Sequence, residues 1–319
     1  MRVYLDADAD LALLRGKKVA VAGYGNQGRA QALNLRDSLA GDVRIALREG
    51  SRSAAVASSD GFDVTAPPEA AAWADILVLL LSDEEQAIFY SQIEAALRPG
   101  AALLFAHGFS IHFRLIEPRS DLDVLLVAPK GPGTALREEY LAGRGLVSLI
   151  AVAQDASGTA EALALSYAAA LGSGRVGILP TSFDEECEAD LFNEQAVLWG
   201  AIPELILAGY ETLVAAGFSP EVAYLECVSE VKLIADLIHA RGIAGMRQAI
   251  SNTAEYGALK GGRRIIGQDA RTEMRRILRE VRSGQFAEDL LADAKAGYPR
   301  VRASRSEAAR HPIEEVGAR

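Results

Sequence analysis

The chain has 319 residues, which is long enough for two domains of ordinary size. Half of the residues are hydrophobic and only 6% are aromatic, a composition that favours α/β or helical packing. The formal net charge of −10 argues against nucleic acid or an anionic membrane as the main partner. A small anionic ligand would therefore need local basic groups.

The N-terminal sequence and the small number of cysteines favour a cytoplasmic location. The first ten residues, MRVYLDADAD, lack the basic and then apolar order of a signal peptide. The most apolar short run, ILVLLL at 76–81, is far too short to cross a bilayer. Two cysteines, Cys187 and Cys227, are too few for a disulfide scaffold and are typical of buried thiols in a reducing compartment. We therefore expect a soluble cytoplasmic protein.

The first half of the chain alternates short apolar runs with helical stretches such as 84–97. The runs have strand length and no polar alternation, which is typical of parallel strands buried on both faces. Their repeated β-α-β-α order predicts an α/β fold with a doubly wound sheet. The predicted strands are 17–23, 43–47, 76–81, 102–106, 124–128, 148–152 and 174–179.

After the last predicted strand the pattern becomes helical. Ser182 and, three residues later, Glu185 form a capping box that predicts the start of a helix. This helix should continue past Pro203, which should kink it. We therefore place an α/β domain at 1–181 and an all-helical domain at 182–319.

Further helices are predicted in the second domain. Ser219 suits an N-cap and Pro220 suits the first helical position. Residues 271–296 supply one or two more helices. The segment from about 297 to 319 is polar, and we expect a partly disordered tail.

A glycine-rich motif follows the first predicted strand and opens a helix. It reads GYGNQG at 23–28, the spacing of dinucleotide-binding loops. Glycines in this context close the turn and let the backbone approach a pyrophosphate at a helix N-terminus. A glycine-rich turn without a ligand is the alternative, which the strand–turn–helix context disfavours. The candidate cofactor-binding residues are Gly23, Tyr24, Gly25, Asn26, Gln27 and Gly28.

The end of the second predicted strand indicates which dinucleotide binds. Where an acid would bind the ribose of NAD, the chain has Arg48 followed by Ser51 and Ser53. Arginine and hydroxyl groups suit the 2′-phosphate of NADP(H). Glu49 is an acid in the same loop and argues against a 2′-phosphate site. The alternative is a solvated basic loop that binds no cofactor. We predict NADPH as the cofactor.

Two further polar residues follow predicted strands. His107 comes just after 102–106, and Lys130 just after 124–128. Ligands on open α/β sheets bind beyond the carboxyl ends of the strands. A lysine there can polarise a substrate oxygen, and a histidine can hold or relay a proton. Loop residues without a catalytic role are the equally weighted alternative.

Acidic residues recur at four-residue spacing in two apolar helical stretches. Asp190 and Glu194 form one pair, and Glu226 and Glu230 the other, so each pair lies on one helix face. A solvated acidic stripe is the common outcome, but apolar neighbours leave little polar face here. Four carboxylates meeting at one point would suit Mg²⁺, and the absence of histidine and cysteine from both pairs argues against zinc.

Several segments together resemble ketol-acid reductoisomerase, also called acetohydroxy-acid isomeroreductase, in its short bacterial-type form. The resemblance runs along essentially the whole chain, and its later segments are more specific than the glycine motif. It implies an N-terminal Rossmann domain and a knotted all-helical C-terminal domain. The segments are VAVAGYGNQGRAQALNLRDS, LREGSRS, AHGFSIHF, APKGPG, FDEECEADLFNEQAVL, ECVSEVKLIADLI and ISNTAEYG.

The resemblance also implies a homodimer, or a larger assembly of dimers, with two Mg²⁺ ions between helices of different subunits. Asp190 would bridge both ions and Glu194 would bind one, facing Glu226 and Glu230 of the partner subunit. The other implied roles are Ser251 on the substrate carboxylate or hydroxyl, His107 and Lys130 beside the metals, and Gly133 in the cofactor site.

The implied reaction converts 2-acetolactate or 2-aceto-2-hydroxybutanoate in two steps. An alkyl group migrates while Mg²⁺ holds the substrate oxygens and Glu230 lies near the hydroxyl proton. NADPH then reduces the new 2-oxo group, which gives a 2,3-dihydroxy acid of valine and isoleucine biosynthesis.

Departures from the usual family pattern leave the substrate open. Trp199 and Ser229 stand where the family often has other residues, and Arg29 can add positive charge near the phosphates. One alternative is a paralogue with the same chemistry on a different 2-hydroxy-3-keto acid. The other is a non-catalytic NADP-binding protein.

Overall fold

The computed structural model describes residues 2–39 and 42–318. By its internal contacts the chain divides into two compact units, Met1–Cys187 and Glu188–Arg319. We call them unit 1 and unit 2 and describe each by itself.

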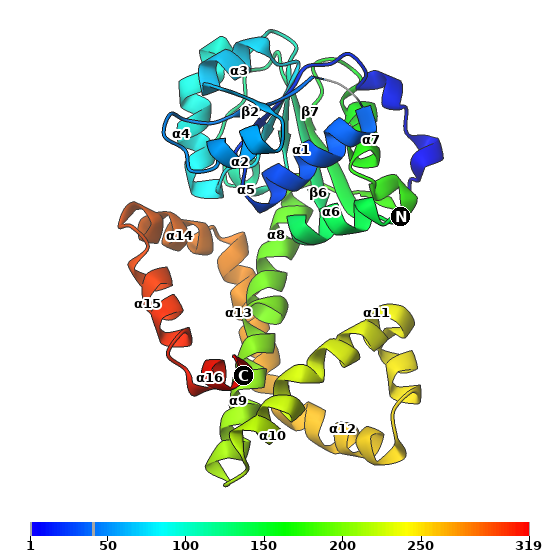
Figure 1. Ribbon diagram of the computed structural model, residues 1–319, viewed down its shortest axis with the longest axis vertical. Coiled ribbons are helices and arrows are strands. Elements are labelled where there is room, and N and C mark those ends of the chain that lie inside the picture. The colour runs from blue at the N-terminus through cyan, green and yellow to red at the C-terminus, as the bar shows by residue number, and fades with distance from the viewer. Residues whose placement is uncertain (1, 40–41, 319) are drawn as a thin grey trace. The chain divides into compact units, whose positions relative to one another are not determined.

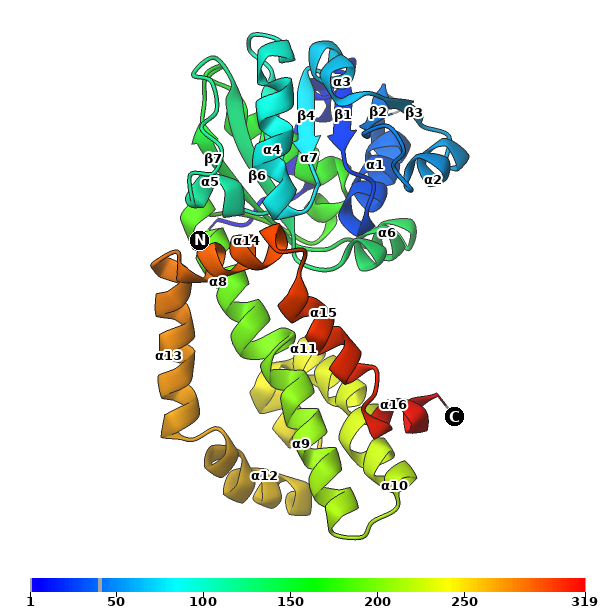
Figure 2. The ribbon, with the colours of Figure 1, turned by 90° about the vertical axis from the view of Figure 1, so that its left-hand side faces the viewer.

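Unit 1 contains an eight-stranded sheet with the order β3-β2-β1-β4-β5-β6-β7-β8. Neighbouring strands pair in parallel except β6 and β7, which are antiparallel. Figure 2 shows β1 to β4 side by side. The strands are β1 (Val19–Ala22), β2 (Val43–Ala46), β3 (Asp63–Thr65), β4 (Ile76–Leu79), β5 (Ala102–Phe105), β6 (Asp123–Pro129), β7 (Ser148–Gln154) and β8 (Ile178–Pro180).

Helices cover both faces of this sheet (Figure 1). In β1, Val19 and Val21 pack on the face covered by α1, α6 and α7, while Ala20 and Ala22 pack toward α3 and α4. This alternation confirms strands buried on both sides. The helices are α1 (Asn26–Leu39), α2 (Ala54–Ser59), α3 (Pro67–Trp73), α4 (Asp83–Ile93), α5 (Phe109–His112), α6 (Gly133–Leu141) and α7 (Ala160–Ala170).

Unit 2 is helical, and its chain enters through α8 (Phe183–Asn193). Two π-helical segments, Glu194–Leu198 and Leu225–Ser229, interrupt its helices. The remaining helices are α9 (Ala201–Ala215), α10 (Pro220–Tyr224), α11 (Val231–Gln248), α12 (Asn252–Ile265), α13 (Gln268–Arg282), α14 (Gln285–Lys295), α15 (Pro299–Ala308) and α16 (Pro312–Gly317).

Two expectations for unit 2 need correction. The kink expected at Pro203 appears upstream as an interruption at Trp199–Gly200, after the π-helical segment, and Pro203 sits in the first turn of α9. A proline ring clashes with the carbonyl four residues earlier, here that of Trp199, which accounts for the position. The expected disordered tail forms α15 and α16, since Pro299 and Pro312 occupy first helical positions that proline favours.

The helices of unit 2 leave much apolar surface exposed. One small buried cluster is formed by Tyr210, Ala223 and Ile313. By contrast, Leu233 is 61% exposed and Leu259 is 62% exposed. The helical stretch 183–215 is also long and apolar enough to cross a membrane, by length and composition, and it is the one such stretch in the described residues. Exposed apolar surface of this extent is typical of an interaction site.

Gly28 in the first turn of α1 generates a testable prediction. A Cβ atom there would overlap the carbonyl oxygen of Gly23. Helix propensity alone would favour alanine by about 1 kcal/mol, but a clash with backbone costs about 1–3 kcal/mol. We expect Gly28→Ala to lower the Tm by a few degrees in thermal unfolding followed by circular dichroism.

The matched control is Gly25→Ala, because a Cβ on Gly25 meets nothing within 4 Å. Its Tm should equal or exceed that of the wild type. A Gly28→Ala protein that melts at the wild-type temperature would contradict the packing described for this turn.

Candidate active site

The glycine loop between β1 and α1 is tightly packed at two of its three glycines. Gly23 has a φ of +96°, and a Cβ there would lie 2.6 Å from the carbonyl oxygen of Leu80. Gly28 packs against Gly23 in the same way. Gly25 instead faces open space and is exposed. The loop therefore offers bare backbone at Gly25, which a pyrophosphate can approach.

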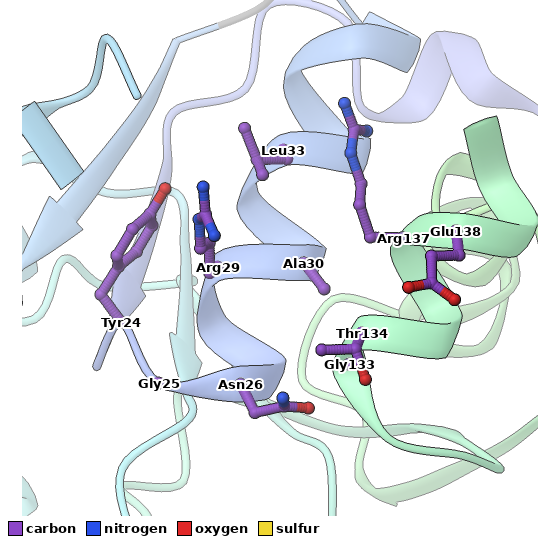
Figure 3. A pocket seen from close by; sticks show the side chains of 10 residues that line it. All are labelled: Tyr24, Gly25, Asn26, Arg29, Ala30, Leu33, Gly133, Thr134, Arg137 and Glu138. Atoms are coloured by element: carbon purple, nitrogen blue, oxygen red, sulfur yellow. The ribbon is translucent and has the colours of Figure 1, made fainter. Parts of the chain in front are cut away.

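Two helix N-termini meet at this loop. α1 begins at Asn26 and α6 begins at Gly133, and a Cβ on Gly133 would overlap the carbonyl oxygen of Asn26. The first N–H groups of a helix lack partners within the helix and favour an anion. A groove of about 500 Å³ runs from this point between α1 and α6 (Figure 3). The arrangement suits a dinucleotide phosphate.

The side chains of the motif mostly hold the loop itself. The Tyr24 ring is buried, and its hydroxyl donates to Asp60 over 2.8 Å. Burial above all, with that bond, raises the pKa of Tyr24. The Gln27 side-chain amide donates to the carbonyl oxygen of Gly131 over 2.9 Å. Tyr24 and Gln27 can therefore contribute to a cofactor site mainly through their backbone.

Arg29, suggested above as a source of positive charge near the phosphates, lines the groove and is paired with Asp60. Its guanidinium donates twice to Asp60, over 2.7 and 3.1 Å. These bonds are the main cause of the lowered pKa of Asp60. Figure 3 shows Arg29, at the start of α1, beside Tyr24 of the preceding loop. Asp60 thus ties the end of α2 to α1.

The loop after β2 holds the predicted 2′-phosphate residues. Arg48 is exposed, while Ser51 and Ser53 are half-buried. The Ser51 amide donates to the carbonyl oxygen of Arg48 over 3.2 Å, which turns the loop back toward α2. All three residues therefore lie within one short turn at the carboxyl end of β2.

His107 and Lys130, predicted from the strand ends, meet at one buried carboxylate. Glu186 on α8 is 1% exposed, and it accepts from Lys130 Nζ over 2.7 Å and contacts His107 Nδ1 at 3.1 Å. The Gly108 amide also donates to it over 2.8 Å. Gly108 permits this approach because a Cβ there would lie 2.5 Å from the carbonyl oxygen of Phe183.

The cluster stabilises charge despite its burial. Burial raises the pKa of Glu186, but His107 and Lys130 outweigh it and lower the pKa to about 2. Burial likewise lowers the pKa of His107, yet hydrogen bonds to Cys187 and Glu186 and the charge of Glu186 raise it well above 6.5. The arrangement holds a cationic lysine and a proton-bearing imidazole at the carboxyl edge of the sheet.

The acidic pairs lie in or beside the π-helical segments. Asp190 is one turn after Glu186 on α8, and Glu194 opens the first π-helical segment; both are half-buried. Glu226 lies in the second π-helical segment and Glu230 directly follows it; both are exposed. π-Helical turns often mark functional sites. A donor set of four carboxylates fits a hard cation such as Mg²⁺.

Ser251 is the N-cap of α12, and its hydroxyl accepts from the Ala254 amide over 3.2 Å. The side chain is exposed. Its position at a helix start is suited to an anionic group such as a carboxylate.

Comparison with known proteins decides the family. Residues 13–177 match the family model for the acetohydroxy acid isomeroreductase NADPH-binding domain, and residues 183–319 match that for the ketol-acid reductoisomerase C-terminal domain. A solved structure of an NADH-preferring ketol-acid reductoisomerase from an uncultured archean is 44% identical, with a TM-score of 0.96. That match covers 100% of this chain and 98% of the other. The chain belongs to the ketol-acid reductoisomerase family.

More distant structures share the fold alone. A putative oxidoreductase from a Jannaschia species is 15% identical with a TM-score of 0.63, covering 83% of this chain and 97% of that one. A semialdehyde dehydrogenase NAD-binding protein from Cupriavidus necator is 19% identical with a TM-score of 0.60, covering 84% and 99%. Membership of the family confirms the predicted α/β fold with a helical C-terminal region and identifies the chain as an oxidoreductase.

Glu186 is the site residue that sequence reasoning missed. It lies four residues before Asp190, as Glu194 lies four residues after it, so all three acids share one helix face. Its apolar neighbours Cys187 and Phe183 are buried with it. The same spacing argument that selected Asp190 and Glu194 would have selected Glu186.

Glu186→Gln should destabilise the protein by about 2 kcal/mol at pH 7. Removing one partner of a fully buried pair costs about 3–5 kcal/mol, but the Lys130 side chain is 32% exposed. The lowered pKa of Glu186 means that its carboxylate stabilises the fold above pH 4.5 and loses this effect as the pH falls toward 2. The raised pKa of His107 adds stability below pH 6.5 that is lost as the pH rises through the folded value.

Urea unfolding of the wild type and Glu186→Gln between pH 3 and pH 9 measures this difference. The free-energy gap should narrow toward acid. Glu185→Gln, an exposed neighbour on α8, should stay within about 0.5 kcal/mol of the wild type. A gap that does not change with pH would contradict the charged assignment.

Proposed function

We propose that the chain catalyses the Mg²⁺-dependent isomerisation of 2-acetolactate or 2-aceto-2-hydroxybutanoate, followed by NADPH-dependent reduction to the 2,3-dihydroxy acid. The observation that carries this is the Lys130–Glu186–His107 cluster, one helical turn before Asp190 on α8. Family membership supports the reaction class. Branched-chain amino-acid biosynthesis in the cytoplasm is the proposed context.

Each residue has a task that follows from its chemistry. Asp190 and Glu194, with Glu226 and Glu230, would hold two Mg²⁺ ions, and Ser251 would bind the substrate carboxylate or hydroxyl. When bound, Mg²⁺ supplies Lewis-acid stabilisation of substrate oxygens and NADPH supplies the hydride. Glu230 takes the hydroxyl proton, directly or through water. Lys130, kept cationic beside Glu186, stabilises the developing negative charge on the substrate oxygen.

NADPH is proposed over NADH because of the loop after β2. Arg48 is exposed there and within one turn of Ser51 and Ser53, so a guanidinium and two hydroxyls can surround a 2′-phosphate. The relative from an uncultured archean prefers NADH. Cofactor choice is thus a property to measure for this chain.

A homodimer is proposed because the exposed apolar helices need cover. Three leucines are each about 60% exposed: Leu225 and Leu233, which lie close in sequence to the exposed acids Glu226 and Glu230, and Leu259 on α12. A membrane would have to accept Asp190 and Glu194 inside the apolar stretch 183–215, which is costly. A second copy can instead bring its own acidic helices, so that Asp190 and Glu194 face Glu226 and Glu230 of the partner subunit.

The central test is 2-acetolactate-dependent oxidation of NADPH with and without Mg²⁺, repeated with NADH. Turnover should require Mg²⁺ and stop with EDTA, and kcat/KM should favour NADPH by about tenfold, since one charge-assisted contact is worth roughly 1.4 kcal/mol. Lys130→Met should lower kcat about 100-fold or more. Lys17→Met, just before β1 at the opposite edge of the sheet, is the matched control and should leave kcat unchanged.

The outcomes separate the alternatives. Turnover of a bulkier 2-hydroxy-3-keto acid with negligible turnover of 2-acetolactate would indicate a paralogue. Trp199, 66% exposed after the first π-helical segment, is the observation that favours this candidate. NADPH binding with no Mg²⁺-dependent turnover of any ketol acid would indicate a non-catalytic protein.

Complementation tests the proposed sharing of ligands between subunits. Asp190→Asn and Glu230→Gln should each be inactive alone. Refolding them together in equal amounts should restore about a quarter of wild-type activity, since half of the dimers are mixed and each has one intact site. Asp190→Asn mixed with Glu194→Gln is the control and should restore nothing. No recovery in the first mixture would contradict sites that join two chains.

A further inference from the structure

The buried face of α1 carries polar side chains where a helix packed on a sheet usually has apolar ones. They recur at helical spacing, so they form one stripe. Gln31 and Asn34 are fully buried, and each is hydrogen-bonded to a different part of unit 1. The polar stripe consists of Gln27, Gln31, Asn34 and Ser38.

At its N-terminal end the stripe forms a chain of hydrogen bonds. Tyr167 of α7 donates to Gln31 Oε1 over 2.9 Å, Gln31 Nε2 donates to Gln27 Oε1 over 3.2 Å, and Gln27 Nε2 donates to the carbonyl oxygen of Gly131 over 2.9 Å. A carbonyl can only accept, so the bond at Gly131 fixes the orientation of both amides. Burial raises the pKa of Tyr167, so the phenol remains a donor.

This chain ends at the place where the two helix N-termini meet. Gly131 lies two residues before α6, and Gln27 is the second residue of α1. On the other side of the same junction, Gly133 packs on the Asn26 carbonyl. Leu146 lies close behind Gly131, where a Cβ would be 2.9 Å from Leu146 Cδ1. The segment before α6 thus lies between α1 and the half-buried side chain of Leu146.

The other end of the stripe is remote from this junction. Ser38 donates to the carbonyl oxygen of Ala170 over 2.6 Å and pairs with the Tyr140 hydroxyl at 2.8 Å. Asn34, between the two ends, donates to the carbonyl oxygen of Leu171 over 3.1 Å and accepts from Arg137 of α6. Ser38 therefore fastens the C-terminal end of α1 and provides an internal comparison.

We infer that Gln31 and Tyr167 are positioning residues for the dinucleotide: through Gln27 they set the spacing between the N-termini of α1 and α6 that bind its phosphates. Neither residue needs to touch the cofactor. A purely apolar stripe could pack α1 on the sheet equally well. Each buried amide, by contrast, costs free energy unless its hydrogen-bond partners are in place, so the amides restrict how α1 can sit. The inference rests on the proposed cofactor function of this loop.

The experiment compares Gln31→Met, Tyr167→Phe and Ser38→Ala in the full-length protein. Methionine matches glutamine in length but makes neither bond. Titration calorimetry with NADPH should show Kd raised about tenfold in Gln31→Met and about threefold in Tyr167→Phe. In steady-state kinetics, kcat should change less than the KM for NADPH. Hydrogen exchange without cofactor should be faster at residues 131–134 in both variants and unchanged there in Ser38→Ala.

Ser38→Ala also removes buried bonds, so it should lower the Tm without altering the NADPH Kd more than twofold. Wild-type affinity and exchange in Gln31→Met, or equal weakening in Ser38→Ala, would overturn the inference and leave the stripe as packing only. A wild-type protein that binds neither NADPH nor NADH would overturn the proposed cofactor function as well.

Discussion

The carboxylate of Glu186 is the interaction on which the candidate active site depends. It lies fully buried and receives three donors, from Lys130, His107 and the Gly108 amide. Those donors follow β5 and β6, while Glu186 belongs to α8, so one charge connects two strand ends with the helix that carries Asp190. A buried carboxylate without such partners would not stay ionised. The arrangement therefore fixes both geometry and protonation at the edge of the sheet.

Two acids of unit 2 would also need counter-charges if they were buried, but in this chain they remain exposed. Glu226 and Glu230 are exposed in the single chain and lie among exposed leucines. A surface that combines carboxylates with exposed leucines is suited to burial in an interface, provided that a positive charge neutralises the carboxylates there. Under the proposed function, divalent cations and a second chain would supply what lysine and histidine supply to Glu186. This contrast favours metal binding at an interface over a solvated acidic stripe.

Sequence patterns predicted the features that rest on strong local signals. Seven of the eight strands were found from their apolar runs, although β8 begins at Ile178 rather than at the predicted residue 174. β3 was missed because its three residues are exposed or half-buried at the sheet edge. The antiparallel pairing of β7 was also missed, since the direction of a strand leaves no mark in its composition. The π-helical segments were invisible for a similar reason: residues four apart still share roughly one face, so spacing alone reads as α-helix.

Side-chain roles were harder to predict than their positions. Tyr24 and Gln27 lie in the glycine motif as expected, yet their side chains bond to Asp60 and Gly131. A sequence motif predicts the path of the backbone. The role of a side chain depends on its hydrogen-bond partners, which can be distant in sequence. Gln31 and Tyr167 show this most clearly, because they are 136 residues apart and nothing local links them.

The two polar networks of unit 1 differ in charge, and the difference matches what each one adjoins. The chain from Tyr167 to Gly131 is neutral, so it can shape a phosphate-binding loop without competing for the positive ends of α1 and α6. A carboxylate in that place would repel the cofactor phosphates. The network at Glu186 is charged: one carboxylate pairs with Lys130 and His107, and in the proposed reaction Lys130 would face a substrate oxygen that gains negative charge. In the two proposals, neutral groups position the cofactor and paired charges serve the reaction.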